Sequence, residues 1–434
     1  MKNLLFITFA LILSFPVAIA QVNPKLQNQI ESMALSMESK VIGWRRHFHQ
    51  YPELSNREFN TAKKIAEHLR ALGLDVTTEV AKTGVVGILK GGKNGPVIAL
   101  RADMDALPVM ERNALPFASK EKAVFNGQET GVMHACGHDT HVAILMGVAE
   151  ILSKVKKDLK GTVKFIFQPA EEGPPAGEEG GAELMVKEGV LENPKVDVVF
   201  GLHIWGISRL GKISYKPGGM MAASDWFTIK VYGKQAHGAF PWKGVDPIVV
   251  SAQIINSLQT LVSRQMNLTQ EAAVVTVGTI HAGIRENIIP EYAEMSGTIR
   301  TLDRDMRKDL LKSMEGMVTH IAESAGARAE LIIEGKTPVT YNDPVLTGKM
   351  EAALVRAAGK ENVALMHADT GAEDFAFFQE KVPGLYIFVG ACPPDVDPDK
   401  APSHHTPDFM IDEKAMLTGL KAMLNLTLEY MFNP

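Results

Sequence analysis

Cysteine is scarce in this chain of 434 residues, where it occurs only as Cys136 and Cys392. The two positions lie far apart, and a disulfide between them would consume a thiol that stands among histidines, so a disulfide framework is not expected. Basic runs are also absent, and the formal net charge is −5. Neither nucleic acid nor an anionic membrane surface is therefore expected as a partner.

Long apolar runs are absent after the N-terminus. Residues 1–20, MKNLLFITFALILSFPVAIA, join a basic residue, an apolar stretch and small residues before Gln21. This order is typical of a cleaved signal peptide, whereas a membrane anchor needs a longer apolar run. We therefore expect an exported protein, periplasmic or secreted, without a membrane partner after cleavage.

Apolar strands and amphipathic helices alternate through much of the remaining chain. Helical patterns run from about Pro24 to His49 and from about Asn56 to Leu72, and β-rich runs follow, among them PVIALRAD, TVKFIFQPAEE and VDVVFGLH. Such alternation predicts an α/β fold with a mostly parallel sheet that is buried on both faces.

A different order begins near residue 213. The pattern there is strand, helix, strand, strand, helix, strand, which is the βαββαβ order of a ferredoxin-like sandwich. We therefore predict a larger domain formed by residues 21–212 and 336–434. An inserted ferredoxin-like domain, residues 213–335, would serve as a lid or dimerisation domain.

Polar side chains follow three of the apolar strands. They are Asp103 and Asp105, then the pair Glu171 and Glu172, then His203. In open parallel sheets the binding crevice lies outside the carboxyl ends of the strands. We therefore expect these side chains to converge with the segment HACGHDTH, residues 134–141, which precedes a helix.

The residue types at this edge suit divalent metal ions. Cys136 and His138 stand two apart, and Glu172, His203 and the pair His404-His405 add enough ligands for two zinc or manganese ions that share a ligand. Two such ions lower the pKa of a water and polarise a carbonyl. One of the two adjacent glutamates would bind metal, and the other would act as the general base.

Other polar residues near the motif have supporting or structural roles in this interpretation. Asp105 is expected to orient a metal ligand from behind, and the same role is open for Asp103. His134 and His141 are interpreted as a flanking residue and as part of a helix surface, and neither is counted as a ligand.

Nine sequence blocks carry a resemblance that covers nearly the whole chain after residue 20. They are RRHFHQYPELSNREFNTA, LRADMDALP, HACGHDTH, PAEEG, GLH, GKQAHGAFPWKGVDPI, NIIPEYAEMSGTIRTLD, GAEDFAFF and HHTPDF. The chain resembles the aminoacylase and carboxypeptidase-like binuclear metallopeptidases, and within them the N-acyl-amino-acid amidohydrolases such as hippurate hydrolase and the auxin-conjugate hydrolases.

The resemblance implies a role for individual residues. The larger domain would be catalytic, with Glu171 as the general base and five metal ligands, which are Cys136, His138, Glu172, His203 and His405. The last ligand is a choice between two histidines, because relatives usually carry an apolar residue before a single histidine. His405 is favoured over His404 because the following Thr-Pro aligns with it.

Three lid residues match positions that contact the substrate or its transition state in relatives: His237, Asn287 and Arg300. Arg300 lies on the polar face of the strand AEMSGTIRTL. It is expected to hold the carboxylate of an N-acyl-amino acid together with Asn287, while His237 donates to the amide oxygen. If the lid forms a homodimer, His237 can come from a partner subunit.

Three functions are compatible with these residues. The first is metal-dependent hydrolysis of the amide bond of N-acyl-amino acids or small peptides, with two zinc or manganese ions, or cobalt or nickel in vitro. The second is a metal-independent cysteine hydrolase that uses Cys136. The third is a metal-loaded binding protein. The pair Glu171-Glu172 favours the first, because binding alone has no use for a base.

Overall fold

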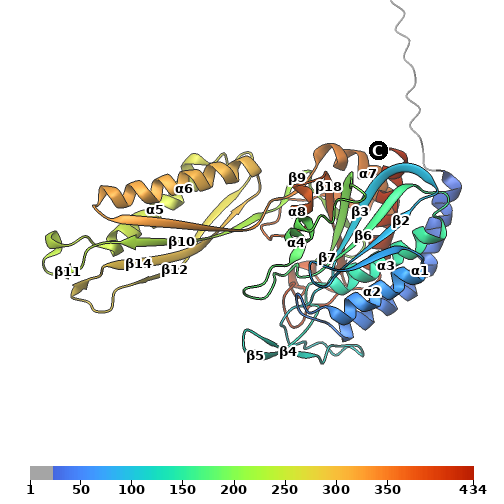
Figure 1. Ribbon diagram of the computed structural model, residues 1–434, viewed down its shortest axis with the longest axis horizontal. Coiled ribbons are helices and arrows are strands. Elements are labelled where there is room, and N and C mark those ends of the chain that lie inside the picture. Colours follow the sequence, from blue (N-terminus) through green and yellow to red (C-terminus); the bar gives the residue numbers. More distant parts are fainter. Residues whose placement is uncertain (1–22) are drawn as a thin grey trace, which may run out of the picture.

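The computed structural model describes residues 23–434, and the predicted signal peptide, residues 1–20, lies outside them. The described part contains a larger unit built on an eight-stranded sheet and a smaller unit with a four-stranded sheet. Figure 1 shows the smaller unit projecting from one side of the larger unit. Among the described helices, none is long and apolar enough to cross a membrane.

The eight-stranded sheet has the order β1-β2-β6-β3-β7-β18-β8-β17. Its strands are β1 (Asp75–Val80), β2 (Gly84–Lys90), β3 (Lys93–Asp103), β6 (Lys160–Gln168), β7 (Val198–Arg209), β8 (Ile213–Tyr215), β17 (Val363–Leu365) and β18 (Gly384–Cys392). The central strands β6, β3, β7 and β18 are parallel, and antiparallel pairs occur toward both edges. The predicted mostly parallel sheet is therefore confirmed.

Helices cover both faces of this sheet. One face packs against α1 (Pro24–Gln50), α2 (Phe59–Ala71), α3 (His138–Lys154), α7 (Pro344–Ala358) and α9 (Ala415–Phe432), and the other against α4 (Gly181–Lys187) and α8 (Ala376–Gln379). Alternate side chains of β3 serve the two cores, since Ile98 and Leu100 lie under the long helices and Ala99 lies on the opposite side. This burial on both faces explains the continuous apolar strands of the sequence.

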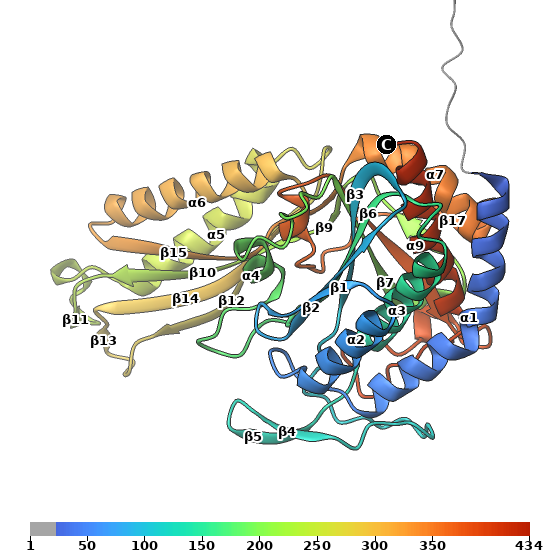
Figure 2. The ribbon, with the colours of Figure 1, turned by 45° about the vertical axis from the view of Figure 1, so that its right-hand side comes forward.

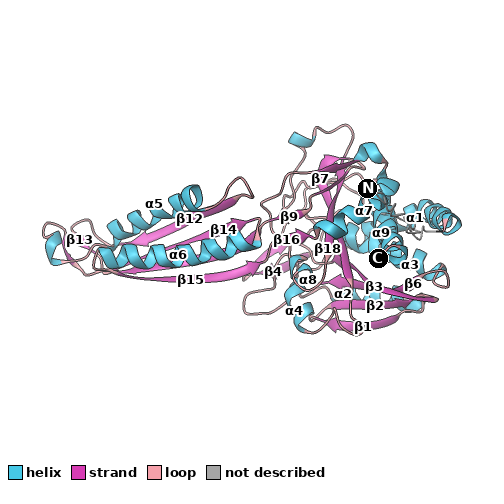
Figure 3. Ribbon diagram, turned by 90° about the horizontal axis from the view of Figure 1, so that it is seen from above, coloured by secondary structure: helices cyan, strands magenta, loops and turns pink. Residues whose placement is uncertain are grey.

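The smaller unit, called the lid below, is an antiparallel sheet with two helices. Its elements are β10 (Ala223–Tyr232), α5 (Pro247–Gln265), β12 (Ala273–Ala282), β14 (Tyr292–Thr301), α6 (Arg304–Ser324) and β15 (Arg328–Thr337). The strand order is β12-β14-β10-β15, and both helices run along the strands, as Figure 3 shows from above. This is the predicted ferredoxin-like arrangement.

Local sequence signals set where the lid helices begin. The side chain of Asp246 accepts a hydrogen bond from the Ile248 backbone N–H at 2.9 Å, and that of Asp303 accepts one from Met306 at 2.8 Å. An aspartate at this position satisfies an amide that the first helical turn leaves free. The lid also has its own core of apolar side chains, separate from the cores of the larger unit.

Short elements connect and decorate the two units. They are the pair β9 (Gly218–Met221) and β16 (Thr340–Asn342), the pair β11 (Ala236–His237) and β13 (Ile288–Ile289), the hairpin β4 (Lys122–Phe125) and β5 (Gln128–Gly131), and the 3-10 turns η1 (Pro241–Lys243), η2 (Lys360–Asn362) and η3 (Pro398–Lys400). Figure 2 shows the β4–β5 hairpin projecting from the larger unit. Although β8 and β9 fall inside the predicted range 213–335, they pair with strands outside the lid, whose sheet begins at Ala223.

Candidate metal centre

The predicted ligands converge at the carboxyl edge of the large sheet. β3 ends at Asp103, β6 is followed by Glu171 and Glu172, and α3 begins at His138. His203 differs from the expectation because β7 continues to Arg209 alongside β18. The pairing of β7 with β3 nevertheless stops at Gly201, opposite Arg101, so His203 lies level with Asp103 at the carboxyl end of β3.

Cys136 lies at the centre of one group of candidate ligands. Its Sγ is 3.3 Å from His203 Nε2 and 3.3 Å from His405 Nε2. His405 Nε2 lies in turn 3.2 Å from Glu172 Oε1. Sulfur, imidazole and carboxylate ligands at such separations form a set that zinc and similar ions accept.

His138 forms a second group with the two glutamates. Its Nε2 is 4.0 Å from Glu172 Oε1 and 3.8 Å from Glu171 Oε2. Glu172 therefore lies between His138 on one side and His405 with Cys136 on the other. The arrangement offers two adjacent sets of ligand atoms.

In His138 and His203, hydrogen bonds engage Nδ1 and leave Nε2, which faces the candidate metal centre, available as a ligand. His138 Nδ1 donates to the carbonyl oxygen of Asp105 at 2.9 Å, and His203 Nδ1 donates to that of Ile204 at 2.6 Å. In the neutral form of both rings, the form that binds metal, the lone pair is then on Nε2. His138 Nε2 is buried and has no hydrogen-bond partner among residues 23–434, which is costly unless a ligand is bound. The residues therefore fit divalent metal ions.

Asp105 orients the glutamates as well as the imidazole. Its carboxylate accepts hydrogen bonds from the backbone N–H groups of Glu171 at 3.1 Å and Glu172 at 3.0 Å, and from Ser55 Oγ at 2.7 Å. Glu58, which the sequence interpretation did not single out, accepts from the backbone N–H of Ala170 at 2.9 Å. Two buried carboxylates thus shape the turn that presents Glu171 and Glu172.

His134 and His141 are both buried, so the interpretation of His141 as part of a helix surface was wrong. His141 donates from Nδ1 to Asp103 Oδ1 at 2.5 Å and accepts at Nε2 from the Ile204 N–H at 2.8 Å. Since both of its nitrogens are occupied, His141 is not available as a metal ligand. It links Asp103 to the strand that carries His203.

A buried arginine supports the same edge and was missed from the sequence. Arg101 contacts Asp103 at 2.6 Å, Glu373 at 2.9 Å and Asp374 at 3.0 Å, and it is fully buried. Its position within the apolar strand VIALRAD was the only signal, because a charged side chain on a buried strand needs buried partners.

The electrostatics of the centre favour cations. Burial, together with the negative charges of Glu373 and Glu172, raises the pKa of Glu171 well above its usual value. Burial and the two glutamates also raise the pKa of the Cys136 thiol well above its usual range. Burial alone would lower the pKa of His138, but Asp103 and Asp105 raise it to about 10. Negative charge therefore exceeds positive charge here, which positive ions would offset.

The three predicted substrate residues of the lid do not form one cluster. His237 and Asn287 are neighbours, since the Gly238 N–H donates to the Asn287 carbonyl at 2.9 Å, and β11 lies at the far end of the lid in Figure 1. Arg300 is paired with Ser224 near the base of the lid. The strand from Tyr292 to Arg300 spans about 27 Å. Within one chain, His237 therefore lies far from Arg300 and from the candidate metal centre.

Comparisons with known proteins agree with this geometry. The model of peptidase family M20/M25/M40 matches residues 99–429. Thermostable carboxypeptidase 1 of Saccharolobus solfataricus is 40% identical over 408 residues, which are 94% of this chain and 98% of that protein. The N-acyl-L-amino acid amidohydrolase of Geobacillus stearothermophilus is 42% identical over 318 residues, 73% of this chain and 82% of that protein.

A solved structure gives the same result. The crystal structure of the Bacillus subtilis YXEP protein, described as a dinuclear metal binding peptidase from the M20 family, superposes with a TM-score of 0.75 and 36% identity, covering 92% of this chain and 99% of that one. The resemblance drawn from the sequence blocks is therefore confirmed. This chain belongs to peptidase family M20/M25/M40, and it is a hydrolase of that family's metal-dependent amidohydrolase and peptidase type.

Proposed function

We propose that this protein hydrolyses the amide bond of N-acyl-amino acids or small peptides, with Glu171 as the general base. The observation that carries the proposal is the unpartnered, buried Nε2 of His138, which faces Glu171 and Glu172 beside the Cys136 group. The names of the relatives support the substrate class, since they include an acyl-amino-acid amidohydrolase, a carboxypeptidase and an N-acetyl-L-cysteine deacetylase of Bacillus subtilis.

Five residues would hold two divalent ions: Cys136, His138, Glu172, His203 and His405. Zinc and manganese suit this mixture of sulfur, imidazole and carboxylate, and cobalt or nickel would substitute in vitro. When bound, the ions supply a lowered pKa for the attacking water and a positive charge for the carbonyl oxygen. His405 is preferred over His404 because its Nε2 faces both Cys136 and Glu172.

Glu171 has the surroundings that a general base requires. It lies beside Glu172 but points its Oε2 within 3.8 Å of His138 Nε2, and its side chain is mostly shielded from solvent. In this position it takes the proton of the attacking water and passes it to the leaving nitrogen. Asp105 fixes the backbone of both glutamates, so their separate tasks depend on one carboxylate.

The environment of Cys136 argues against a cysteine hydrolase. A nucleophilic cysteine needs a lowered pKa, whereas burial and the neighbouring glutamates raise the pKa of this thiol. A binding protein without turnover is disfavoured for another reason, because it would not require Glu171 as a base next to the ligand Glu172.

The lid supplies the specificity in this proposal. Arg300 would bind the carboxylate of the substrate, and His237 with Asn287 would reach the site from the lid of a partner subunit. In one chain, the stretch of β14 from Tyr292 to Arg300, about 27 Å long, separates them from Arg300. Within the described part of the chain, the edge strand β12 has no neighbour on its outer side, and it carries exposed apolar side chains. Free edges of this kind pair readily with a second strand.

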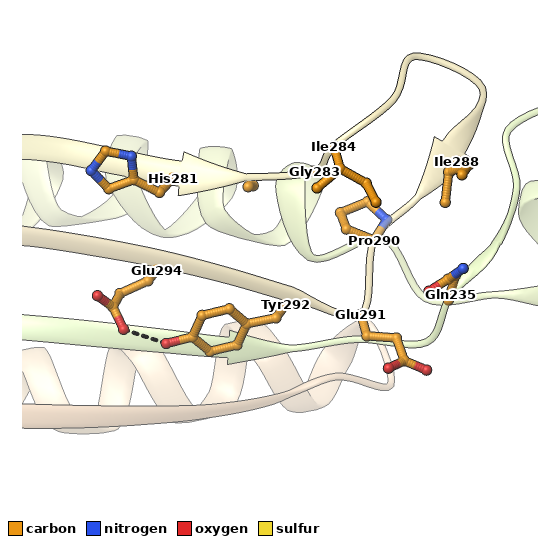
Figure 4. Close-up of a pocket in the computed structure, with 10 residues that line it drawn as sticks. Gln235, His281, Gly283, Ile284, Ile288, Pro290, Glu291, Tyr292 and Glu294 are labelled. Carbon is orange, nitrogen blue, oxygen red and sulfur yellow. Dashed lines mark hydrogen bonds between the residues drawn. The ribbon is translucent and has the colours of Figure 1, made fainter.

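Apolar residues at the same end of the lid support a homodimer. Ile284 is 95% exposed, and Ile248 and Ile280 are also exposed. Ile284, Ile288 and Pro290 border a surface hollow that also includes Tyr292 and Glu294, as Figure 4 shows. Export of the mature protein to the periplasm or the medium remains part of the proposal, on the strength of residues 1–20.

A substrate panel tests the proposed function directly. The purified protein is stripped of metal, reloaded with Zn²⁺, Mn²⁺ or Co²⁺, and assayed on benzoyl-, acetyl- and indolyl-amino acids and on dipeptides. We expect hydrolysis that a chelator abolishes and that added metal restores. Activity that survives the chelator but is lost on thiol alkylation would instead establish the cysteine hydrolase.

A further inference from the structure

His404 is a second histidine at the metal centre, directly before His405. Its ring stacks on Trp205 with centroids 4.7 Å apart, and it contacts the ring of Phe409 at 4.6 Å. Its Nδ1 is 3.8 Å from Cys136 Sγ. His404 therefore belongs to the surroundings of the sulfur, although the proposed function assigns it no task.

The hydrogen bond on the far side of the ring determines which nitrogen carries the proton. The backbone N–H of Gly206 donates to His404 Nε2 at 3.1 Å. Nε2 must then present its lone pair, and a neutral imidazole in this state carries its proton on Nδ1. Nδ1 therefore directs an N–H group, and not a lone pair, toward Cys136.

His203, another imidazole near the sulfur, differs in this respect. His203 donates from Nδ1 to a backbone carbonyl, so the lone pair of its Nε2 is free toward the centre. His405 also faces the sulfur with Nε2, at 3.3 Å. In the described part of the chain, His404 thus contacts Cys136 through a protonated nitrogen, whereas His203 contacts it through a lone pair.

We propose that His404 is a positioning residue that donates a hydrogen bond from Nδ1 to the Cys136 thiolate and does not bind metal itself. The inference rests on the proposed function, because it takes Cys136 as a metal ligand. An N–H donor withdraws negative charge from a bound thiolate, and it holds the sulfur in place against two neighbouring glutamates. Such outer contacts typically change metal affinity about 10- to 100-fold.

Three substitutions distinguish the hydrogen bond donated by His404 Nδ1 from the packing of its ring. His404→Phe keeps an aromatic ring against Trp205 and Phe409 but removes both nitrogens. His404→Asn places an amide N–H near the position of Nδ1, and His404→Gln places its amide near Nε2, where it can accept from Gly206 but not reach the sulfur. Each variant is first checked for folding by the thermal unfolding of its metal-free form.

The readout is cobalt binding, followed by the absorption band of thiolate-to-cobalt charge transfer. We expect His404→Phe and His404→Gln to bind two Co²⁺ per chain, with affinity lowered about 10- to 100-fold and with the band moved to longer wavelength. His404→Asn should remain close to the wild type in both respects. If His404→Phe does not fold, the Gln and Asn variants decide the question alone.

Other outcomes overturn the inference. Loss of one Co²⁺ per chain in His404→Phe or His404→Gln would make His404 a ligand, and a band and affinity unchanged in all three variants would exclude a hydrogen bond to the sulfur. Failure of the proposed function is distinguishable, because the wild type itself would then bind no Co²⁺ or show no thiolate band.

Discussion

Combining two inactive variants tests whether one active site uses residues of two chains. Glu171→Gln removes the proposed base, and His237→Ala removes the imidazole at the far end of the lid. In one chain His237 is separated from Arg300 by a strand of about 27 Å, so the two cannot contact the same small substrate. If His237 acts on the site of a partner, chains carrying the two different defects should complement each other.

The expected recovery follows from counting sites in a symmetric dimer. Random association of equal amounts of the two chains makes about half of the dimers mixed. In a mixed dimer, the chain with Glu171 intact receives the partner's His237, whereas the other site carries both defects. Half of the sites in half of the dimers are then complete, so about one quarter of wild-type activity should return.

The assay uses coexpression of the two variants with different affinity tags, so that mixed dimers are purified in tandem. Purified mixed dimers should have about half of the activity of the wild-type dimer. The matched control combines Glu171→Gln with Glu172→Gln. Both residues belong to the same chain's metal centre, so this mixed dimer should remain inactive.

The reasoning is refuted if mixed dimers of the first pair form but stay as inactive as either variant alone. That result would mean that His237 acts within its own chain after a large movement of the lid, or that it has no role in turnover. A protein that remains monomeric at assay concentrations while fully active would also refute it.

Single substitutions separate the other roles. Glu171→Gln should still bind two metal ions but lose about 10²- to 10⁴-fold in turnover, whereas Glu172→Gln should lose metal, as elemental analysis would show; the reverse pattern would exchange the two assignments. Arg300→Ala should remove a charge-assisted hydrogen bond worth about 1.5–3 kcal/mol and raise KM for N-acyl-amino acids about ten- to a hundredfold. Their amides should be much less affected, and equal losses on both would contradict carboxylate binding. Arg101→Leu leaves three buried carboxylates without their cation and should lower the free energy of unfolding in urea by about 3–5 kcal/mol. Lys122→Ala, which breaks an exposed ion pair, should cost about 0–1 kcal/mol.

Much of the architecture could be predicted because it follows from local patterns. The continuous apolar runs of β3, β6 and β7 indicate strands that are buried on both faces, and strand direction then places Glu171, Glu172 and His203 at one edge of the sheet. The ferredoxin-like lid was predicted in the same way from the order of its elements. Cys136 and His138 reach this edge because they stand where α3 begins.

The sequence could not distinguish the roles of similar side chains. His138 and His141 are three residues apart on α3 and are both buried, but only His138 leaves a nitrogen free toward the glutamates. His404 and His405 are adjacent, and they differ because Gly206, far away in the chain, donates to the first. Which lone pair is free depends on hydrogen-bond partners that only folding brings near.

The tertiary structure alone also decided the distances that bear on mechanism. Only Asp103 among the ionic partners of Arg101 lies on the same strand, whereas Glu373 and Asp374 come from a distant segment, so its role as a buried support could not be derived from that strand alone. The sequence interpretation assigned His237 and Arg300 to the same substrate, yet they occupy opposite ends of the lid. Periodicity determines which face of a strand a residue occupies, whereas the pairing of distant strands determines which residues can meet one substrate.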